Sequence, residues 1–324
     1  MVRGAWIVVA IIGASVAVMS LFFLLGEGLR QEYHVPSRGD RERYDLDLTE
    51  ERVVWLEWGG KVLWAPLGPT RRQPLVLEEA NASLVHPVLA EGTLAAWVEG
   101  RGPLQVRVHD FALNASVTLG DPARGDSLLL PGRTLDGRTL LVAGRWNGTG
   151  GLFAATFGED LSYDVTPVDG LFQEAAPRGP LLLADGQVWW AEGLQVHLAP
   201  LGNLAERRTF DAGGRVVNLT AEGDLVAWAE ERGTYRRVII ANLSSGNQTE
   251  ASTFPADQRE PALNGTRVLF VQHDGLVRLV DLATGEERVL PARNQENVHL
   301  RLGPSWAAWL SGTIEGHNVF LVPL

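Results

Sequence analysis

Cysteine is absent from the 324 residues, which excludes disulfides, thiolate catalysis, cysteine-ligated zinc, iron–sulfur clusters and c-type haem. Basic residues are also few, because 28 Lys and Arg stand against 39 Asp and Glu, for a formal net charge of −11. Phosphate-backbone binding needs clustered basic side chains, so no nucleic-acid partner is expected. Nucleophile elbows, zinc-binding helices and phosphate loops are missing as well. We therefore assign no catalytic, cofactor-binding or metal-binding residue and expect a protein that is not an enzyme.

A single long uncharged run is present at the N-terminus, Trp6–Leu25. At about 1.5 Å per residue such a helix spans roughly the 30 Å hydrocarbon core of a bilayer. Arg3 precedes the run and Glu27 follows it, which favours a cytoplasmic N-terminus. The sequence predicts a cytoplasmic tip over 1–5, a transmembrane anchor over 6–25, a linker over 26–30 and an extracellular domain over 31–324, held at the cell membrane.

Two other interpretations of the same run remain open. A cleaved signal peptide has a shorter apolar region and a small-residue cleavage site, which Gly26-Glu27-Gly28 matches poorly. Arg3-Gly4 before the run resembles the processing site of archaeal pilin-like proteins. Cleavage there would begin the chain at Ala5 and would suit a subunit of a surface filament.

Glycosylation sequons support an extracellular location. Asn-x-Ser/Thr begins at Asn81, Asn114, Asn147, Asn218, Asn242, Asn247 and Asn264. A single sequon is often coincidence, but this density predicts N-glycosylation at several of them, with the asparagines on blade edges and loops. Many sequons without cysteine are typical of an archaeal-like cell-surface protein, since extracellular eukaryotic domains commonly carry disulfides.

A repeated unit indicates the fold. It runs from Leu through a short, often Gly-containing turn and small or β-branched apolar residues to an aromatic, and recurs about every 40 residues, a period typical of propeller blades. The units end at Trp55, Trp97, Ala143, Trp190, Trp228, Phe270 and Trp309. Each is followed by further short alternating strands, so the sequence predicts an all-β, seven-bladed β-propeller over 31–324.

The clearest unit, Leu135-Asp136-Gly137-Arg138-Thr139-Leu140, resembles the WD40-like repeats of TolB-type β-propellers. The resemblance covers 31–324, although Asp-Gly is kept only here and at Asp185-Gly186, with Glu-Gly or Asn-Gly in other units. It implies a ring of blades with a central funnel.

Ring closure is predicted from the two ends of the chain. The last unit lacks its outer strand, whereas residues 32–38 parallel the segment Glu287–Arg293 of the preceding unit. We expect residues 31–36 to supply the outermost strand of the seventh blade, because closure removes an exposed sheet edge.

Several side chains invite a functional interpretation, but a structural one is favoured. The repeated tryptophans predict packing between blades, and packing is also favoured for Trp58, Trp64, Trp146, Trp189 and Trp306. Of the dispersed histidines, His109 and His197 occupy comparable third-strand positions. Asp45-x-Asp47 and Glu50-Glu51 lack the spacing of a calcium loop and are interpreted as a solvated face.

The expected function is that of a membrane-anchored, N-glycosylated module that binds or scaffolds an unidentified surface protein or glycan. A homo-oligomer or filament, and an enzyme of the hydrolase, lyase or quinoprotein type acting in the funnel, are the alternatives. Two or more buried carboxylates or histidines converging in the funnel within hydrogen-bond reach would overturn the non-enzyme interpretation.

Overall fold

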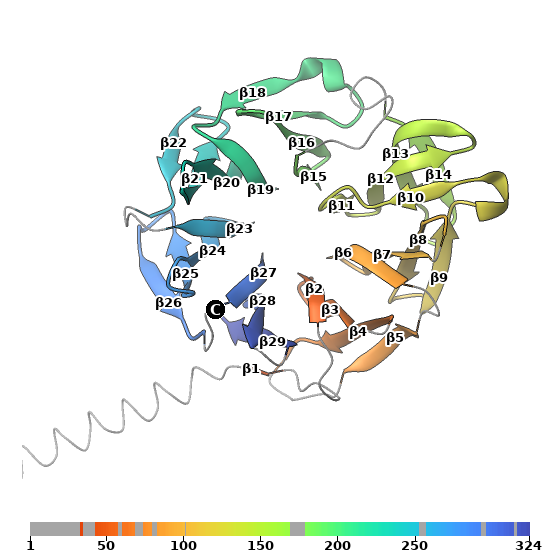
Figure 1. The fold of residues 1–324 in the computed structure, drawn as a ribbon, viewed down its shortest axis with the longest axis horizontal. Coiled ribbons are helices and arrows are strands. Elements are labelled where there is room, and N and C mark those ends of the chain that lie inside the picture. Colours follow the sequence, from red (N-terminus) through yellow and green to blue (C-terminus); the bar gives the residue numbers. More distant parts are fainter. Residues whose placement is uncertain are drawn as a thin grey trace, which may run out of the picture.

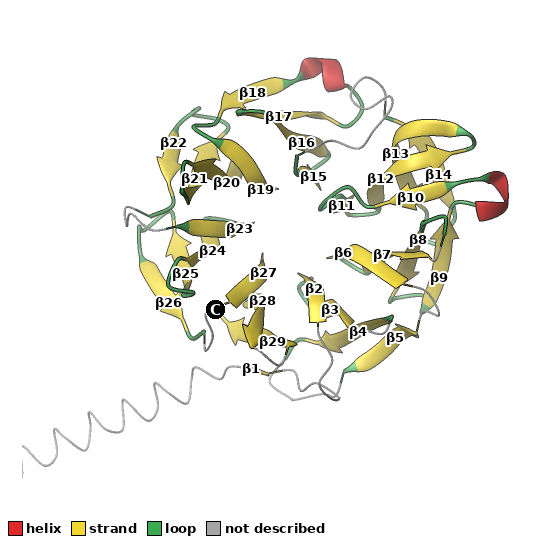
Figure 2. Cartoon of the chain, in the orientation of Figure 1, coloured by secondary structure: helices red, strands yellow, loops and turns green. Residues whose placement is uncertain are grey.

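A computed structural model describes residues 33–34, 43–57, 60–68, 74–79, 83–100, 102–168, 179–252, 257–292, 296–313 and 316–324. The chain forms a ring of seven small sheets around a central channel (Figure 1). Strands make up nearly all of the ring, with two single-turn helices, η1 (Pro122–Arg124) and η2 (Leu204–Glu206), at its outer edge (Figure 2). The predicted seven-bladed propeller is confirmed.

The blades are numbered from the first complete sheet, each with its innermost strand named first. The first contains β2 (Arg43–Leu48), β3 (Arg52–Glu57), β4 (Lys61–Pro66) and β5 (Leu75–Glu79). The second contains β6 (Ser83–Glu91), β7 (Leu94–Gly100), β8 (Gln105–Asp110) and β9 (Ala115–Leu119). The third contains β10 (Ser127–Leu129), β11 (Leu135–Asp136), β12 (Thr139–Trp146), β13 (Thr149–Phe157) and β14 (Tyr163–Pro167).

The remaining blades repeat this pattern. The fourth contains β15 (Leu181–Ala184), β16 (Gln187–Glu192), β17 (Gln195–Pro200) and β18 (Arg208–Asp211). The fifth contains β19 (Arg215–Glu222), β20 (Leu225–Arg232), β21 (Tyr235–Asn242) and β22 (Gln248–Glu250). The sixth contains β23 (Gln258–Asn264), β24 (Arg267–Gln272), β25 (Val277–Asp281) and β26 (Glu287–Leu290). The seventh contains β27 (Glu296–Leu302), β28 (Trp306–Thr313), β29 (Gly316–Pro323) and β1 (Tyr33–His34).

The seventh blade is built from both ends of the chain. Tyr33 and His34 of β1 pair antiparallel with Leu321 and Phe320 of β29. This pairing confirms the predicted closure, in which an N-terminal segment supplies the outermost strand. The predicted anchor at Trp6–Leu25 lies outside the described residues. Within the described residues, no helix has both the length and the apolar character needed to cross a bilayer.

Seven apolar clusters, each between two neighbouring blades, form the core. The fourth residue of the second strand faces the preceding blade in every case. This residue is Trp55, Trp97, Val142, Trp190, Trp228, Phe270 or Trp309, and all are buried. Packing of the repeated tryptophans between blades is thus confirmed.

The third blade departs from the expected repeat. Its unit was expected to end at Ala143, but the equivalent position is Val142, and Phe153 of the adjacent strand β13 adds an aromatic ring to the same cluster. Trp189 is also buried, while Trp64, Trp146 and Trp306 are half-buried and pack against the clusters. Trp58 lies outside the described residues.

The buried tryptophans differ in whether the indole N–H donates a hydrogen bond, so two of them can be compared in a matched mutational test. Trp228 Nε1 donates to Glu230 Oε2 at 2.8 Å, whereas Trp97 Nε1 has no partner among the described residues. Both indoles are fully buried. Trp228→Phe should therefore lower the free energy of unfolding by about 1–3 kcal/mol more than Trp97→Phe, because it leaves a buried carboxylate short of a donor. Urea unfolding of the two variants measures this difference, and equal losses would show that the N–H contributes nothing.

Candidate functional site

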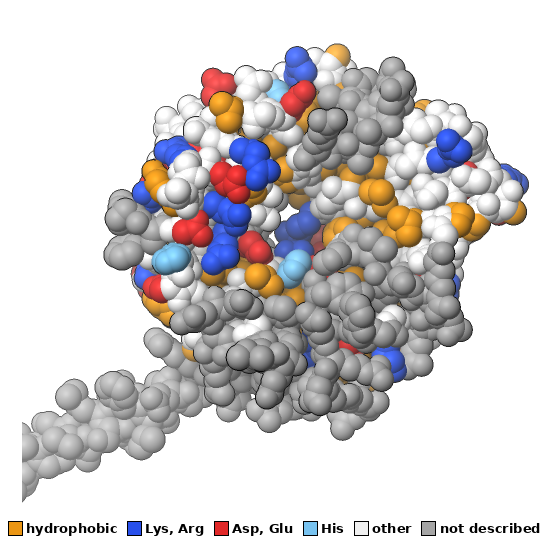
Figure 3. Space-filling model, viewed as in Figure 1, with side chains coloured by type: hydrophobic (Ala, Val, Ile, Leu, Met, Phe, Trp, Pro, Cys, Tyr) orange, Lys and Arg blue, Asp and Glu red, His pale blue; other side chains and the backbone are white. Residues whose placement is uncertain are grey.

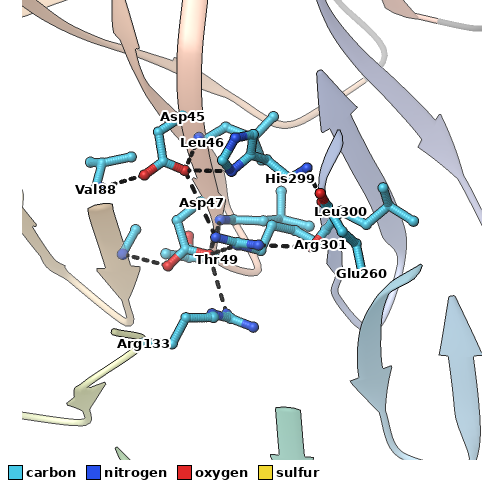
Figure 4. A network of polar contacts seen from close by, with 12 residues as sticks. Asp45, Leu46, Asp47, Thr49, Val88, Arg133, Glu260, His299, Leu300 and Arg301 are labelled. Atoms are coloured by element: carbon cyan, nitrogen blue, oxygen red, sulfur yellow. Dashed lines mark hydrogen bonds and ion pairs between the residues drawn. The ribbon is translucent and has the colours of Figure 1, made fainter. Parts of the chain in front are cut away.

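The centre of the ring carries a network of charged side chains (Figure 4). Asp45 and Asp47 lie on β2, and each is only 2% exposed. The expectation of a solvated face at Asp45-x-Asp47 is therefore wrong, whereas Glu50 and Glu51 are exposed as expected. Leu46 and Leu48 alternate with the aspartates and pack into the cluster between the first and seventh blades. The period of two places the aspartates on the other side of the strand.

Asp47 connects four blades. Its Oδ2 accepts the backbone N–H of Ala90 on β6 at 2.9 Å. Its Oδ1 accepts from Arg301 Nε on β27 at 2.7 Å and from Arg133 Nη2 of the third blade at 3.2 Å. The Leu48 N–H also donates to Oδ1 of Asp47, at 3.0 Å. The carboxylate thus holds its own blade to the second, third and seventh.

Asp45 has a similar role beside it. Its Oδ2 accepts the Val88 N–H at 3.0 Å, and its Oδ1 accepts the Leu46 N–H at 2.8 Å and lies 3.1 Å from Nδ1 of His299. Burial raises the pKa of Asp45, but the hydrogen bond and charge of His299, the charge of Arg301 and the Val88 N–H outweigh burial. The pKa of Asp45 is therefore lowered, and the group is held as a carboxylate.

Local irregularities of the innermost strands aim these side chains. The ladder shifts register between Arg43 and Asp45 on β2 and between Val298 and Arg301 on β27. Such bulges redirect a side chain. His299 has φ +55°, an uncommon conformation for a residue other than glycine, and its backbone N–H donates to the Glu260 carboxylate of β23. Strain of this kind is typical of sites where a side chain must hold one direction.

Arg133 reaches the network because the innermost strand of the third blade is interrupted. Between β10 and β11 the backbone runs against the fourth blade, where the Leu183 N–H donates to Arg133 O at 2.9 Å. A Cβ on Gly132 would lie 2.1 Å from Leu181 O, so only glycine permits this approach. Burial lowers the pKa of Arg133 and the charge of Asp47 opposes this lowering.

A cavity of about 540 Å³ opens at one end of the channel. It lies between the turns that follow the innermost strands, and we call this end of the ring the mouth face. The described lining includes seven carboxylate residues, namely Asp47, Glu50, Glu51, Glu91, Asp136, Asp185 and Glu222, with Arg133 as its basic residue.

The Asp-Gly repeat of the sequence builds this acidic rim. Asp136 Oδ2 accepts the Gly186 N–H of the next blade at 2.6 Å, and Asp185 Oδ2 accepts the Gly223 N–H of the blade after it at 2.7 Å. Each of these turns therefore joins its blade to the following one. Glu91 occupies the same position in the second blade, where reduced hydration first, and then the nearby charge of Asp47, raises the pKa of its carboxyl.

The sequons lie at different depths. Asn114, Asn147 and Asn247 are exposed in turns, and Asn242 is half-buried at the end of β21. Asn264 lines the mouth cavity. Asn218 lies on the innermost strand β19, which is the edge strand of its blade on the channel side. Asn81 lies outside the described residues. Glycosylation itself stays a prediction.

The other titratable candidates are structural. His109 Nδ1 lies 2.9 Å from Ser116 Oγ and His197 Nδ1 lies 2.9 Å from Thr209 Oγ1, each across to the outermost strand. Both rings are buried on third strands, as predicted. In the part of the chain that the structure describes, no group of three or more His, Asp or Glu side chains could hold a metal ion. No motif in the sequence singles out Arg133, His299, Arg301 or Glu260.

The network does bring together Asp45 and His299, which satisfies the geometric condition stated for an enzymatic funnel. The Asp45 carboxylate, 3.1 Å from Nδ1 of His299, can fix the direction of the imidazole ring. The Asp45 carboxylate nevertheless accepts from at least three donors, and the Asp47 carboxylate accepts from four. Both carboxylates therefore serve first to hold blades together.

The lowered pKa of Asp45 predicts a pH dependence of stability. The folded chain keeps this group ionised below its ordinary pKa of 3.8, where the unfolded chain binds a proton. The stabilisation is thus complete above that value and is lost as the pH falls through the lowered folded pKa. Asp45→Asn should cost about 1–3 kcal/mol at pH 7 and flatten the fall in unfolding free energy at acidic pH. Asp211→Asn, at an exposed site on β18, should keep the wild-type slope in the same urea titrations; a steep slope retained in Asp45→Asn would contradict the assignment.

Comparison with known proteins places the fold. No protein-family profile and no curated protein sequence matches the chain. The WD40 domain of Neurospora crassa Pan2 superposes with a TM-score of 0.61 at 13% identity, over 90% of this chain and 93% of that one. BamB from Moraxella catarrhalis superposes with a TM-score of 0.50 at 17% identity, over 86% of this chain and 84% of BamB. PorZ of Porphyromonas gingivalis superposes with a TM-score of 0.58 at 11% identity, over 90% of this chain and 38% of PorZ. PorZ is described as a bacterial surface component of the type-IX secretion system. These identities establish the fold alone, which is that of a seven-bladed β-propeller.

Proposed function

We propose that this chain is a membrane-anchored, N-glycosylated extracellular module that binds a partner protein at the mouth of its propeller. The observation that carries the proposal is the cavity of about 540 Å³ between the turns that follow the innermost strands. Turns held at fixed positions by a rigid ring suit recognition. The similarity in fold to the Pan2 WD40 domain and to BamB is consistent with a scaffold that binds protein partners.

The chemistry of the mouth selects a basic partner segment. Among its described lining residues, seven carboxylates face one arginine, and the raised pKa of Glu91 reflects reduced hydration together with the crowding of negative charge around it. A concave acidic site concentrates the field and attracts cations. A lysine- or arginine-rich loop of another surface protein would neutralise this charge without displacing Asp136 or Asp185 from their inter-blade hydrogen bonds.

The proposed location, on the outer side of the cell membrane, follows from the predicted anchor and the predicted glycans. The apolar run Trp6–Leu25 and the seven sequons support that location. The filament alternative rests on Arg3-Gly4, and the Asp45–His299 pair favours the enzyme alternative. Binding is preferred because the carboxylates of the network are committed to backbone and arginine donors.

Mass spectrometry of the protein from its native membranes tests location. The expected result is a chain that retains residues 1–25 and carries glycan mass on exposed sequon peptides such as those of Asn114 and Asn147. A chain that begins at Ala5 would contradict the anchor and would favour the filament subunit. Sequon peptides without added mass would contradict the predicted glycosylation. A chain that starts near Glu27 would show that the N-terminal run is a cleaved signal peptide and that the protein is secreted.

Charge removal at the mouth tests binding, with an oligolysine peptide as the probe and the full chain in detergent. The double variant Glu91→Gln/Glu222→Gln should weaken binding by about tenfold, since each of the two lost charge contacts contributes about 0.7 kcal/mol. Glu159→Gln/Glu286→Gln removes the same charge from exposed outer turns and should change affinity less than about twofold. Equal losses in the two variants, read by fluorescence anisotropy, would show attraction to net charge alone and would contradict a site at the mouth.

A further inference from the structure

The opposite end of the ring carries an unusual concentration of arginine. Figure 3 shows basic and acidic side chains interleaved beside the channel over the strands β19 to β24. The structure gives five arginines here, on the strand ends and turns of the fifth and sixth blades. They are Arg215, Arg232, Arg236, Arg237 and Arg259, which we call the arginine ridge.

A ladder of carboxylates holds the ridge in place. Glu231 binds Arg215 Nη2 through Oε2 at 2.6 Å and Arg236 Nη2 through Oε1 at 3.1 Å. Glu250 lies 3.7 Å from Arg232 and 3.3 Å from Arg237. Exposed ion pairs of this kind stabilise the fold little, but they fix long side chains that would otherwise lose rotamer freedom on binding. The ladder therefore preorganises the guanidinium groups.

The ridge sets five arginines against four carboxylates, which leaves one positive charge in excess in a chain whose net charge is −11. Glu230 is fully buried, and its carboxylate accepts hydrogen bonds from Trp228 Nε1, the Gly213 N–H and Arg232 Nε. Glu231, Glu250 and Asp257 are the carboxylates that the ion pairs place among the five arginines near the surface. Arg215 and Arg236 are bound to Glu231 through Nε and Nη2, and a guanidinium has further N–H donors for a second carboxylate.

The ridge also has the composition of a binding surface. Tyr235, in the same turn, is 43% exposed, and the Arg237 guanidinium lies 5.0 Å from the centroid of its ring. Exposed Tyr beside Arg is enriched where proteins bind one another. A rigid ring with an adjacent row of fixed cations fits an extended, carboxylate-rich segment.

Strand direction separates the ridge from the mouth face and from the start of β1. Trp306, which follows the mouth turn at Gly303, pairs with Pro323 at the end of β29. Tyr33 pairs with Leu321 and His34 with Phe320, so the chain enters β1 from the mouth face. The ridge lies at the other end of the strands, about 20 Å away for strands of six to eight residues.

We propose that the arginine ridge is a second docking surface, which binds an acidic segment of a different protein. A second copy is disfavoured as occupant, because two chains that each carry a net charge of −11 repel one another. The ring then bridges a basic partner at the mouth and an acidic partner at the ridge. The inference goes beyond the proposed function and does not depend on the mouth binding a partner.

An oligoglutamate peptide serves as the probe, with the full chain in detergent. The double variant Arg215→Glu/Arg236→Glu should weaken binding by about tenfold or more and lower the salt dependence of the affinity. The control Arg124→Glu/Arg288→Glu makes the same change in net charge at the third and sixth blades. The side chains of Arg124 and Arg215 are equally exposed at 70%, and the control should change affinity less than about twofold.

Three outcomes would overturn the proposal. Equal losses in variant and control would show attraction to net charge, and wild-type binding to phosphatidylserine vesicles but not to oligoglutamate would show a lipid surface. Dimerisation of the wild-type chain that Arg215→Glu/Arg236→Glu abolishes would show a second copy as the occupant. If the double Glu variant unfolds at a lower temperature than the wild type, Arg215→Gln/Arg236→Gln replaces it and should still weaken binding several-fold. Binding of oligolysine, which reports on the mouth, should be unchanged in either variant.

Discussion

The innermost strand of every blade has one edge that faces the channel instead of another strand, and its backbone N–H groups still need acceptors. On β6, carboxylates of the preceding blade supply acceptors, since Asp45 and Asp47 accept the N–H groups of Val88 and Ala90. Asp136 and Asp185 likewise reach the following blade, where they accept the N–H groups of Gly186 and Gly223 in the turns after β15 and β19. The acidic composition of the chain is thus partly a structural requirement of the ring. The same carboxylates give the mouth face its charge.

Apolar packing and ring closure depend on this arrangement and complete it. Large rings at one repeat position fill the space between twisted sheets, and the third blade uses Val142 with Phe153 where the others use one aromatic side chain. The pairing of β1 with β29 joins the N-terminal segment to the last blade. Because the ring is closed, each blade packs on two neighbours, which keeps the turns of both faces at fixed positions.

The two ends of the ring differ in charge. Carboxylates dominate the described lining of the mouth cavity, while the arginine ridge gathers cations on the fifth and sixth blades (Figure 3). A scaffold that must hold two unlike partners needs such a difference, because charge complementarity steers each partner to its own surface. The Asp45–His299 pair lies between the two ends and holds the first blade to the seventh.

The sequence alone determined the number of blades, the tryptophan layer and the closure of the ring, because these depend on a repeat that alternation and spacing reveal directly. It also marked the Asp-Gly turns, although their inter-blade hydrogen bonds were not apparent. Only the tertiary structure decided that Asp45 and Asp47 are buried, since strand alternation does not say which side of an innermost strand meets the next blade's N–H groups. The convergence of Arg133, His299 and Arg301 on these aspartates was likewise hidden, because it depends on bulges and on a break at Gly132 that bring together residues up to 254 positions apart. The ridge arose in the same way, since Arg215 and Arg236 share Glu231 only after β19, β20 and β21 have paired.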